Sequence, residues 1–398
     1  MFHYRSSFMR VPFPRIAISG FGCVSPLGVG LRSTVENLRH SRDSVSPVRL
    51  FPVDKCLAKT AGQVDENLRE VATSILARSK RWTRAAQMIL VAMAEALAAK
   101  PRFIPDCVVI GTTSGGMSLG EQFYRSLASG SPAWSATRKV RAYAPQEPVM
   151  QAMSLFGFTS PVRIISNACA SGTNALGLAC EIIRVGSARR VLAGGYDALS
   201  QLVFAGFDCL RATTAEKCRP FDAARTGLSL GEGAAVFCLE KTDSDLSITG
   251  YGSSTDSHHL TQPHPSGRGP LTAMRRALEC AKVDPASVEY INAHGTGTPL
   301  NDSSEARAIL ALCPHAPVSS TKSMTGHALG AAGAIEAAFC CLALREEFLP
   351  SNINFNQSEF PLDIVANEIR AQKIRRVVSN SFGFGGANAA LVLERHSQ

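Results

Sequence analysis

The chain repeats part of itself, and this repetition limits its possible folds more than any other feature. Residues 16–25, IAISGFGCVS, are echoed by residues 246–255, LSITGYGSST, and both segments read as a buried strand that ends near glycines. A second pair closes each half, because residues 231–240, GEGAAVFCLE, resemble residues 385–394, GGANAALVLE. Each member of this pair follows a glycine-rich turn, which is typical of a strand. The repetition predicts a duplicated chain.

We expect the two halves to be residues 15–245 and 246–398. Within each half, short β-branched runs alternate with longer helical patterns, which is typical of strands joined by crossover helices in an α/β fold. Two of the helical segments have apolar residues on nearly every face, which predicts that they are buried central helices. Two similar halves with such helices imply one body of five layers, α-β-α-β-α. The predicted strands are residues 107–110, 162–165 and 191–193, and the predicted central helices are residues 174–185 and 330–344.

Composition excludes several classes of protein. A hydrophobic fraction of 45% over 398 residues is enough for a large core. No uncharged apolar run reaches membrane-spanning length, and the first residues lack a signal-peptide core, so we expect a cytoplasmic protein with no membrane segment. The 12 cysteines lack the close spacing of a disulfide framework and suit reduced thiols. The net charge of +9 points to an anionic partner, although the absence of a long Lys/Arg block argues against nucleic acid.

Cys169 is the first candidate for chemistry. It lies in residues 167–172, NACASG, between a predicted strand and a buried helix, with small residues on both sides. Such a strand-to-helix turn is typical of a nucleophile elbow. The helix N-terminus favours a thiolate, and the small neighbours admit a substrate carbonyl. The competing interpretation is an inert buried cysteine, and this segment alone leaves the two about equal.

Two histidines in the second half of the chain lie at glycine-flanked ends of predicted elements, as Cys169 does in the first half. His294 follows a predicted strand in a Gly/Thr loop, and His327 stands where the second buried helix begins. A metal site is the obvious alternative for Cys169 with two histidines, but structural zinc normally takes four ligands with close spacing in sequence. Thiol catalysis fits better, because histidines can polarise a carbonyl and stabilise enolate charge while the thiolate carries an acyl group. The glycine cluster at residues 383–386 could supply an oxyanion-hole N–H.

Together the motifs resemble the type II β-ketoacyl-[acyl carrier protein] synthases over residues 15–395. These motifs are NACASG at 167–172, AHGTGTPLND at 293–302, KSMTGHALGAAG at 322–333 and NSFGFGGAN at 380–388. The resemblance implies the thiolase fold, a cytoplasmic homodimer or a heterodimer, and no cofactor, since the substrates are carried on the phosphopantetheine of acyl carrier protein. It also implies an acyltransferase that performs a decarboxylative Claisen condensation of malonyl-carrier with an acyl group on Cys169.

The same resemblance assigns roles to further residues. His294 and His327 would assist decarboxylation, with Lys322 and Glu336 as a supporting pair, Lys322 tuning His327 and the local field. The Cys169 and Phe384 amides would hold the thioester oxygen, and Phe384 would also act as a gate. Thr296 and Thr298 would bind the pantetheine arm, and Asp302 would be structural. The residues expected to dock the acidic carrier are Lys80, Arg81, Arg84, Arg138, Lys139 and Arg211.

Three related classes compete with this assignment. A chain-length-factor subunit is a non-catalytic partner in which the nucleophile is replaced, typically by glutamine, and Cys169 argues against it. A thiolase would place a second cysteine in residues 383–386, which hold none. A priming enzyme would have asparagine where His327 stands. Ala170 and Ala387 replace threonines common in housekeeping elongation enzymes, so fatty-acid, aryl-polyene and polyketide pathways stay open.

Overall fold

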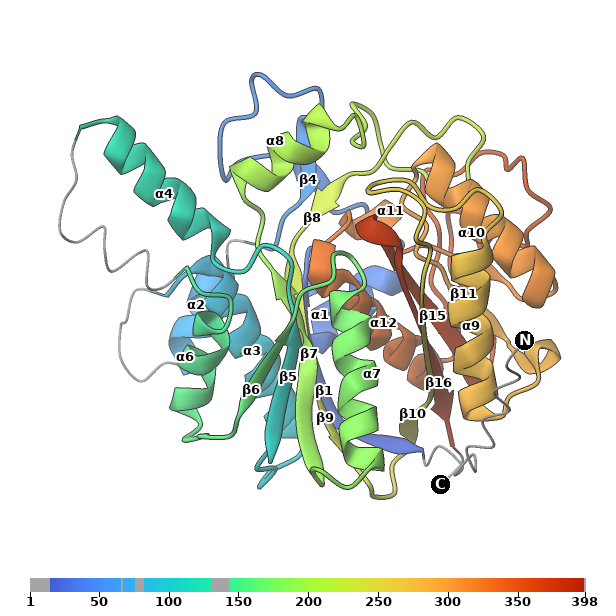
Figure 1. The fold of residues 1–398 in the computed structure, drawn as a ribbon, viewed down its shortest axis with the longest axis horizontal. Coiled ribbons are helices and arrows are strands. Elements are labelled where there is room, and N and C mark those ends of the chain that lie inside the picture. Colours follow the sequence, from blue (N-terminus) through green and yellow to red (C-terminus); the bar gives the residue numbers. More distant parts are fainter. Residues whose placement is uncertain (1–14, 66, 76–81, 131–142, 397–398) are drawn as a thin grey trace, which may run out of the picture.

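The computed structural model describes residues 15–65, 67–75, 82–130 and 143–396. Its central feature is a mixed sheet made of two five-stranded halves (Figure 1). The first half has the order β6 (Val162–Ile165), β5 (Cys107–Gly111), β7 (Arg190–Asp197), β9 (Gly233–Glu240) and β1 (Ile16–Ser25). The second half has the order β12 (Val318–Ser319), β11 (Tyr290–Asn292), β15 (Arg376–Gly383), β16 (Ala387–Arg395) and β10 (Leu246–Thr255). The halves meet where β1 pairs with β10.

The duplication extends to an irregularity of the sheet. β1 runs antiparallel to β9 with a register shift between Ile18 and Gly20. β10 runs antiparallel to β16 with the same kind of shift between Ile248 and Gly250, at the corresponding place in the echoed sequence. Because a bulge bends a strand and increases its twist, the equivalent bulges give both halves the same curvature. The predicted repeat is therefore confirmed at the level of strand register.

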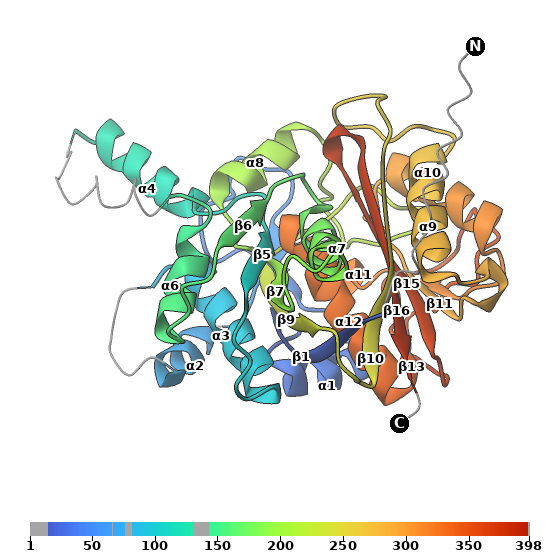
Figure 2. The same ribbon diagram turned by 60° about the horizontal axis from the view of Figure 1, so that its bottom comes forward.

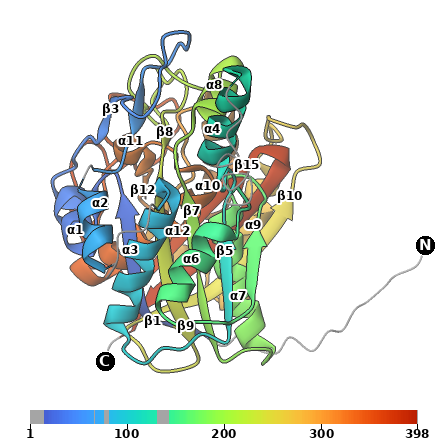
Figure 3. The same ribbon diagram turned by 90° about the vertical axis from the view of Figure 1, so that its left-hand side faces the viewer.

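Helices cover both outer faces and fill the space between the half-sheets. α7 (Ser171–Arg184) and α12 (Ala332–Glu346) pack against each other between the halves, where Figures 1 and 2 show them at the centre. On one outer face lie α2 (Leu68–Ile75), α3 (Arg84–Ala99) and α6 (Glu147–Leu155), seen from their own side in Figure 3. On the other lie α9 (Arg268–Ala281) and α10 (Pro299–Leu312). The predicted five layers, strands and central helices are thus confirmed.

Shorter elements complete the chain. The remaining helices are α1 (Leu31–Arg39), α4 (Met117–Ala128), α8 (Gln201–Cys209) and α11 (Lys322–Thr325), with 3₁₀ turns η1 (Pro285–Ser287), η2 (Leu329–Ala331) and η3 (Phe384–Gly386). The remaining strands are β2 (Gly28–Val29), β3 (Val45–Pro47), β4 (Thr60–Gly62), β8 (Leu230–Gly231), β13 (Phe348–Leu349) and β14 (Arg370–Ala371). In the described ranges, no helix combines the length and the apolar character needed to cross a bilayer.

Close packing of helices on the sheet explains why the echoed strands contain glycine. A Cβ atom at Gly22 would lie 2.3 Å from the carbonyl oxygen of Ala92 in α3. In the second half, a Cβ at Gly252 would lie 2.2 Å from the carbonyl oxygen of Ala273 in α9. Both distances are far below van der Waals contact, so either helix would have to move away from its strand to admit a side chain.

This packing predicts that Gly22→Ala and Gly252→Ala each lower the free energy of unfolding by about 1–3 kcal/mol, the usual cost of overpacking. Gly206→Ala is the matched control, because a Cβ there meets no atom within 4 Å. In helix α8 it should leave stability unchanged or raise it by up to about 1 kcal/mol. Denaturant unfolding of the three variants measures this. Equal stability of Gly22→Ala and Gly206→Ala would contradict the packing argument.

Candidate active site

The turn that carries Cys169 is closed by its own side chains. Ala168, immediately before Cys169, has a φ of 54°, in the left-handed region that non-glycine residues rarely adopt. Ser171 holds this turn, because its hydroxyl donates to the Ala168 carbonyl (2.6 Å) and accepts the N–H of Asn167 (2.9 Å). α7 starts at Ser171, so the predicted strand-to-helix elbow is present and Cys169 lies at its bend.

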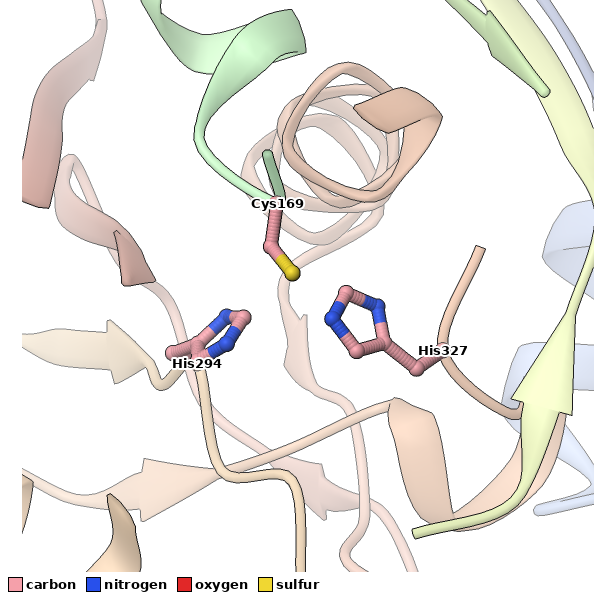
Figure 4. Close-up of side chains that lie close together, drawn as sticks. All are labelled: Cys169, His294 and His327. Atoms are coloured by element: carbon pink, nitrogen blue, oxygen red, sulfur yellow. The ribbon is translucent and has the colours of Figure 1, made fainter. Parts of the chain in front are cut away.

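The two histidines come from the second half. His294 lies just beyond β11, and its backbone N–H donates to the Glu305 carboxylate at 2.8 Å. His327 lies just beyond α11, and its N–H donates to the Ser229 carbonyl at 2.7 Å. The imidazole ring centres are 5.2 Å apart and the ring planes are nearly perpendicular, at 83°. Figure 4 shows the Cys169 sulfur directed toward the space between the two rings.

The fold therefore brings all three predicted residues into one site. The Cys169 sulfur and one ring nitrogen from each histidine lie within 4.8 Å of one another. Cys169 is 6% exposed, His294 2% and His327 1%. Both ring nitrogens of His327 and Nδ1 of His294 have no hydrogen-bond partner among the described protein groups. These atoms are available to bind a substrate oxygen or to move a proton.

Burial changes the expected protonation of the Cys169 thiol. The sequence position favoured a thiolate, but burial raises the pKa of Cys169 to about 11. The positive charge of Lys322 and the backbone N–H groups of Phe384 and Cys169 lower this pKa, and the charge of Asp197 raises it. The thiolate expectation is therefore wrong for the substrate-free protein, because the loss of hydration outweighs the local N–H groups.

Both imidazoles are neutral at physiological pH. Burial, Lys322 and His327 hold the pKa of His294 well below its usual range. Burial and Lys322 have the same effect on the pKa of His327. A protonated thiol therefore faces two neutral bases, and proton transfer to an imidazole can generate the thiolate when a substrate arrives.

Lys322 forms a buried ion pair with Glu336, as the resemblance implied. Its ammonium group also donates to the His294 carbonyl at 2.6 Å. Lys322 is 1% exposed. It thus contacts the backbone of His294 directly and acts on His327 through its charge. A cation held here stabilises negative charge that develops at the site.

An open cavity of about 380 Å³ leads to these residues. Cys169, His294 and His327, all buried, are among the residues that line it. Thr296 and Thr298 also line it, with their hydroxyl oxygens 2.9 Å apart, and so does the exposed Arg211. A cavity lined by a thiol, two imidazoles and two hydroxyl groups can bind a substrate that has both a reactive carbonyl and polar groups able to hydrogen-bond.

Phe384 lies at the start of η3 beside the nucleophile. Its ring stacks on Phe207 of α8 with the ring centres 5.5 Å apart. The next residue, Gly385, has a φ of 77°, and its N–H donates to the Leu260 carbonyl at 2.7 Å. The Phe384 backbone N–H lowers the pKa of the Cys169 thiol and so faces it. The predicted glycine cluster therefore places an N–H donor and an aromatic side chain next to the thiol.

Two buried carboxylates were missed in the sequence. Glu305 of α10 accepts the N–H groups of His294 and Gly295 and so fixes the His294 loop. Burial raises the pKa of Glu305 to about 7. Asp197 ends β7 and is fully buried. In the sequence, Asp197 is only an acidic residue shortly after a predicted strand, and Glu305 is only an acidic residue in the first turns of a helix. Neither position shows from which N–H or hydroxyl groups the carboxylate will accept hydrogen bonds.

The structure describes only two of the six residues that were expected to dock the carrier, Arg84 and Arg211. Lys80, Arg81, Arg138 and Lys139 lie outside the described residues. Arg84 turns inward: its guanidinium bonds to the fully buried Glu232, with Nε 2.8 Å from Oε1, and to the Val64 carbonyl. It therefore serves the fold and is not a free surface charge. Arg211 is exposed at the cavity.

The Cys169, His294 and His327 ligand atoms lie close enough to hold a metal ion. Among the residues described, no second group of three or more Cys, His, Asp or Glu side chains meets the same distance criterion. A zinc ion bound there would have one sulfur and two nitrogen ligands and an open fourth position. Measuring the metal content of the purified protein distinguishes this use of the trio from thiol catalysis.

Comparison with known proteins places this geometry in a family. Residues 14–244 match the model of the beta-ketoacyl synthase N-terminal domain, and residues 246–356 match that of the C-terminal domain. A 3-oxoacyl-[acyl-carrier-protein] synthase 2 of Staphylococcus aureus (strain N315) is 34% identical, covering 96% of this chain and 98% of the relative. Two solved structures are also similar. One is the ishigamide ketosynthase/chain length factor, with TM-score 0.90, 29% identity and coverage of 96% and 100%. The other is a type II polyketide acyl carrier protein in complex with its ketosynthase bound to the hexaketide, with TM-score 0.86, 26% identity and the same coverages.

The fold and the site define a condensing enzyme of the acyltransferase class, built on the thiolase fold. The chain belongs to the beta-ketoacyl synthase family.

The raised pKa of Cys169 makes a testable prediction about its reactivity. Alkylation by iodoacetamide requires the thiolate, so its rate at Cys169 should keep rising about tenfold per pH unit until the pH approaches 11. At pH 8, the exposed Cys209 should be labelled well before Cys169. Peptide mass spectrometry of a time course resolves the two sites. A rate at Cys169 that levels off below pH 8 would show that the thiol is more acidic than its burial dictates.

Proposed function

We propose that this chain is a catalytically active 3-oxoacyl-[acyl carrier protein] synthase that uses Cys169 as nucleophile. The supporting observation is the buried cluster of Cys169, His294 and His327, which lines the cavity. The alternative is a non-catalytic chain-length-factor-like subunit. We favour the enzyme because the cysteine and both neutral imidazoles are in reach of one another, which a purely structural subunit does not require.

In the first half-reaction, an acyl group moves from a carrier thioester to Cys169. An imidazole accepts the thiol proton while the sulfur attacks the acyl carbon. The N–H groups of Cys169 and Phe384 stabilise the oxyanion that forms on the carbonyl oxygen. The bond to the pantetheine sulfur then breaks, and this sulfur leaves with the proton as a free thiol.

In the second half-reaction, a malonyl thioester loses CO₂. The electron pair of the broken bond forms an enolate, whose oxygen is stabilised by His294 and His327, with the charge of Lys322 nearby. The enolate carbon attacks the Cys169 thioester and forms a carbon–carbon bond. The cysteine sulfur leaves as a thiolate and takes up a proton from solvent, and the product is a 3-oxoacyl thioester two carbons longer.

The other lining residues have supporting roles in this proposal. Thr296 and Thr298 bind the amide groups of the pantetheine arm through their hydroxyls. Phe384 moves between its stack on Phe207 and a position that admits the acyl chain, and the positive φ of Gly385 provides backbone freedom beside it. Glu336 holds Lys322 in place through their buried ion pair.

The proposed partner is an acidic acyl carrier protein. Support comes from the net charge of +9, from Arg211 at the cavity and from the similar structure in which a carrier is in complex with its ketosynthase. Six residues were expected to dock the carrier. Among those that the structure describes, Arg211 is exposed at the cavity.

We further propose that the protein forms a cytoplasmic dimer. β6 pairs only with β5 among the described strands, so its other edge is left without a partner. Three of its four residues are apolar and half-buried. An apolar edge strand of this kind is a template for pairing with another chain. Similar structures contain a ketosynthase with its chain length factor, so the second chain is a copy of this one or a related subunit.

Mass spectrometry with a panel of acyl-carriers tests the function and identifies the substrate. The purified protein should gain a single acyl mass on Cys169 and then release a 3-oxoacyl-carrier when malonyl-carrier is added. The acyl groups retained, whether saturated, polyunsaturated or polyketide, assign the chain to fatty-acid, aryl-polyene or polyketide synthesis. No acyl adduct from any member of the panel would favour the non-catalytic subunit.

Replacing the nucleophile should separate the two half-reactions. Cys169→Ala should abolish the acyl adduct and keep the fold, because a small residue fits the turn. Cys169→Gln should release CO₂ from malonyl-carrier faster than Cys169→Ala, because its carboxamide imitates the thioester carbonyl. Labelled acyl retained by Cys169→Ala would refute the nucleophile assignment. Equal CO₂ release from the two variants would refute the mimicry.

Loss of a histidine should affect condensation more than loading. The enolate charge develops only in the second half-reaction, so His294→Ala and His327→Ala should still acylate while CO₂ release falls by about 10²–10³. Single-turnover acylation and CO₂ release measure the two steps separately. An equal loss in both steps for both variants would show that the histidines serve the site as a whole.

Arg211 should act on carrier encounter and not on chemistry. Arg211→Glu should raise the KM for acyl-carrier and weaken its salt dependence, because a rim charge steers association. Turnover of a small acyl-pantetheine thioester should stay near wild type. Arg275→Glu is the control, since Arg275 is exposed on α9 and does not line the cavity. Equal effects of Arg211→Glu on both substrates would move the docking surface elsewhere.

A further inference from the structure

Asp197 lies at the point where three active-site segments meet. It is the last residue of β7 and is fully buried. One carboxylate oxygen accepts the hydroxyls of Thr112 and Ser114, both at 2.7 Å, and the Ser114 N–H at 2.8 Å. The other accepts the N–H of Thr113 at 2.9 Å and of Gly330 at 2.7 Å. Burial raises the pKa of Asp197, but every partner donates to it, and this arrangement favours an ionised carboxylate.

These bonds connect both parts of the catalytic cluster. On the nucleophile side, the Thr113 hydroxyl donates to the carbonyl of Ala168, the strained residue before Cys169, at 3.1 Å. On the histidine side, Gly330 belongs to η2, the 3₁₀ turn that follows His327. The contact is close, because a Cβ at Gly330 would lie 2.7 Å from the Thr113 nitrogen. One carboxylate therefore joins the Cys169 turn to the segment that leads out of His327.

We propose that Asp197 is a positioning residue that holds the Cys169 turn and the segment after His327 in one arrangement, and whose negative charge acts on the nucleophile. This inference rests on the proposed function and adds a residue to it. Asparagine could not replace the carboxylate, since its amide offers one acceptor oxygen where two oxygens now receive five donors. Its NH₂ group would face N–H or O–H donors at one end of the cluster.

The negative charge of Asp197 can be tested separately from its structural role, because only the charge should shift the pH midpoint of Cys169 alkylation. Asp197 raises the pKa of Cys169, and Lys322 opposes it. Removing the negative charge should therefore lower that pKa, so the pH midpoint of Cys169 alkylation by iodoacetamide should move to lower pH. Condensation should nevertheless fall, by about tenfold to a hundredfold in kcat, because the sulfur and the imidazole lose their fixed relation.

The experiment compares Asp197→Asn with Asp222→Asn. Asp222 is a matched control, because it is 1% exposed and its carboxylate accepts the backbone N–H groups of Asn356 and Gln357, but it does not contribute to the Cys169 pKa. Alkylation profiles and kcat are measured for both. A lower midpoint with reduced kcat in Asp197→Asn alone supports the proposal. An unchanged or higher midpoint in Asp197→Asn, or the same shift in Asp222→Asn, overturns it.

Thr113→Val tests the connection if Asp197→Asn does not fold. It keeps the carboxylate charge and removes the bond to Ala168, so acyl-enzyme formation should slow by about tenfold while the alkylation midpoint stays at its wild-type value. A wild-type acylation rate would overturn the positioning role. Alkylation needs no carrier or acyl substrate, so it tests the action of Asp197 on Cys169 independently of the proposed function. If the wild-type protein never forms an acyl-enzyme but Asp197→Asn still shows the midpoint shift, the proposed function is refuted and the action of Asp197 on Cys169 stands.

Discussion

The packing of α7 against α12 is the contact on which the active site depends. The two helices belong to different halves of the chain and approach closely because small residues face each other. A Cβ at Gly172 would lie 2.8 Å from the Gly330 carbonyl oxygen, and one at Gly333 would lie 2.0 Å from the Thr173 hydroxyl oxygen. This contact sets the distance between the turn that precedes α7, which carries Cys169, and the segment that precedes α12, which carries His327. A larger residue would separate the thiol from its base.

Burial between the halves also determines the electrostatics. The same loss of hydration raises the pKa of the Cys169 thiol and lowers the pKa values of both imidazoles. Cys169 and the two histidines are thus uncharged in the substrate-free site, and the charged groups beside them include Lys322, its partner Glu336 and Asp197. Burying an ion pair such as Lys322 with Glu336 is costly and contributes little to stability, which agrees with the proposed role of Lys322 in stabilising negative charge during decarboxylation.

Duplication gives the protein two similar scaffolds that it uses differently. Equivalent strands carry equivalent bulges in β1 and β10, and each half-sheet is covered by its own outer helix. The first half supplies Cys169 and Asp197, whereas the second supplies both histidines, Lys322 and Glu336. Neither half holds a complete site, so the chemistry requires both halves in the arrangement that the central helices impose.

The repeat, the main strands and the two central helices could be predicted from the amino-acid sequence alone, and the same motifs singled out Cys169, His294 and His327, which the fold brings together. These follow from local periodicity and from small residues at strand ends, which the chain order records directly. Tertiary structure decided the protonation of the thiol, the inward turn of Arg84 and the bonds of Asp197. Each of these depends on which groups from distant segments become neighbours and on how much water they exclude. Hydration and pairing are properties of the packed halves together, and no local pattern of residues encodes them.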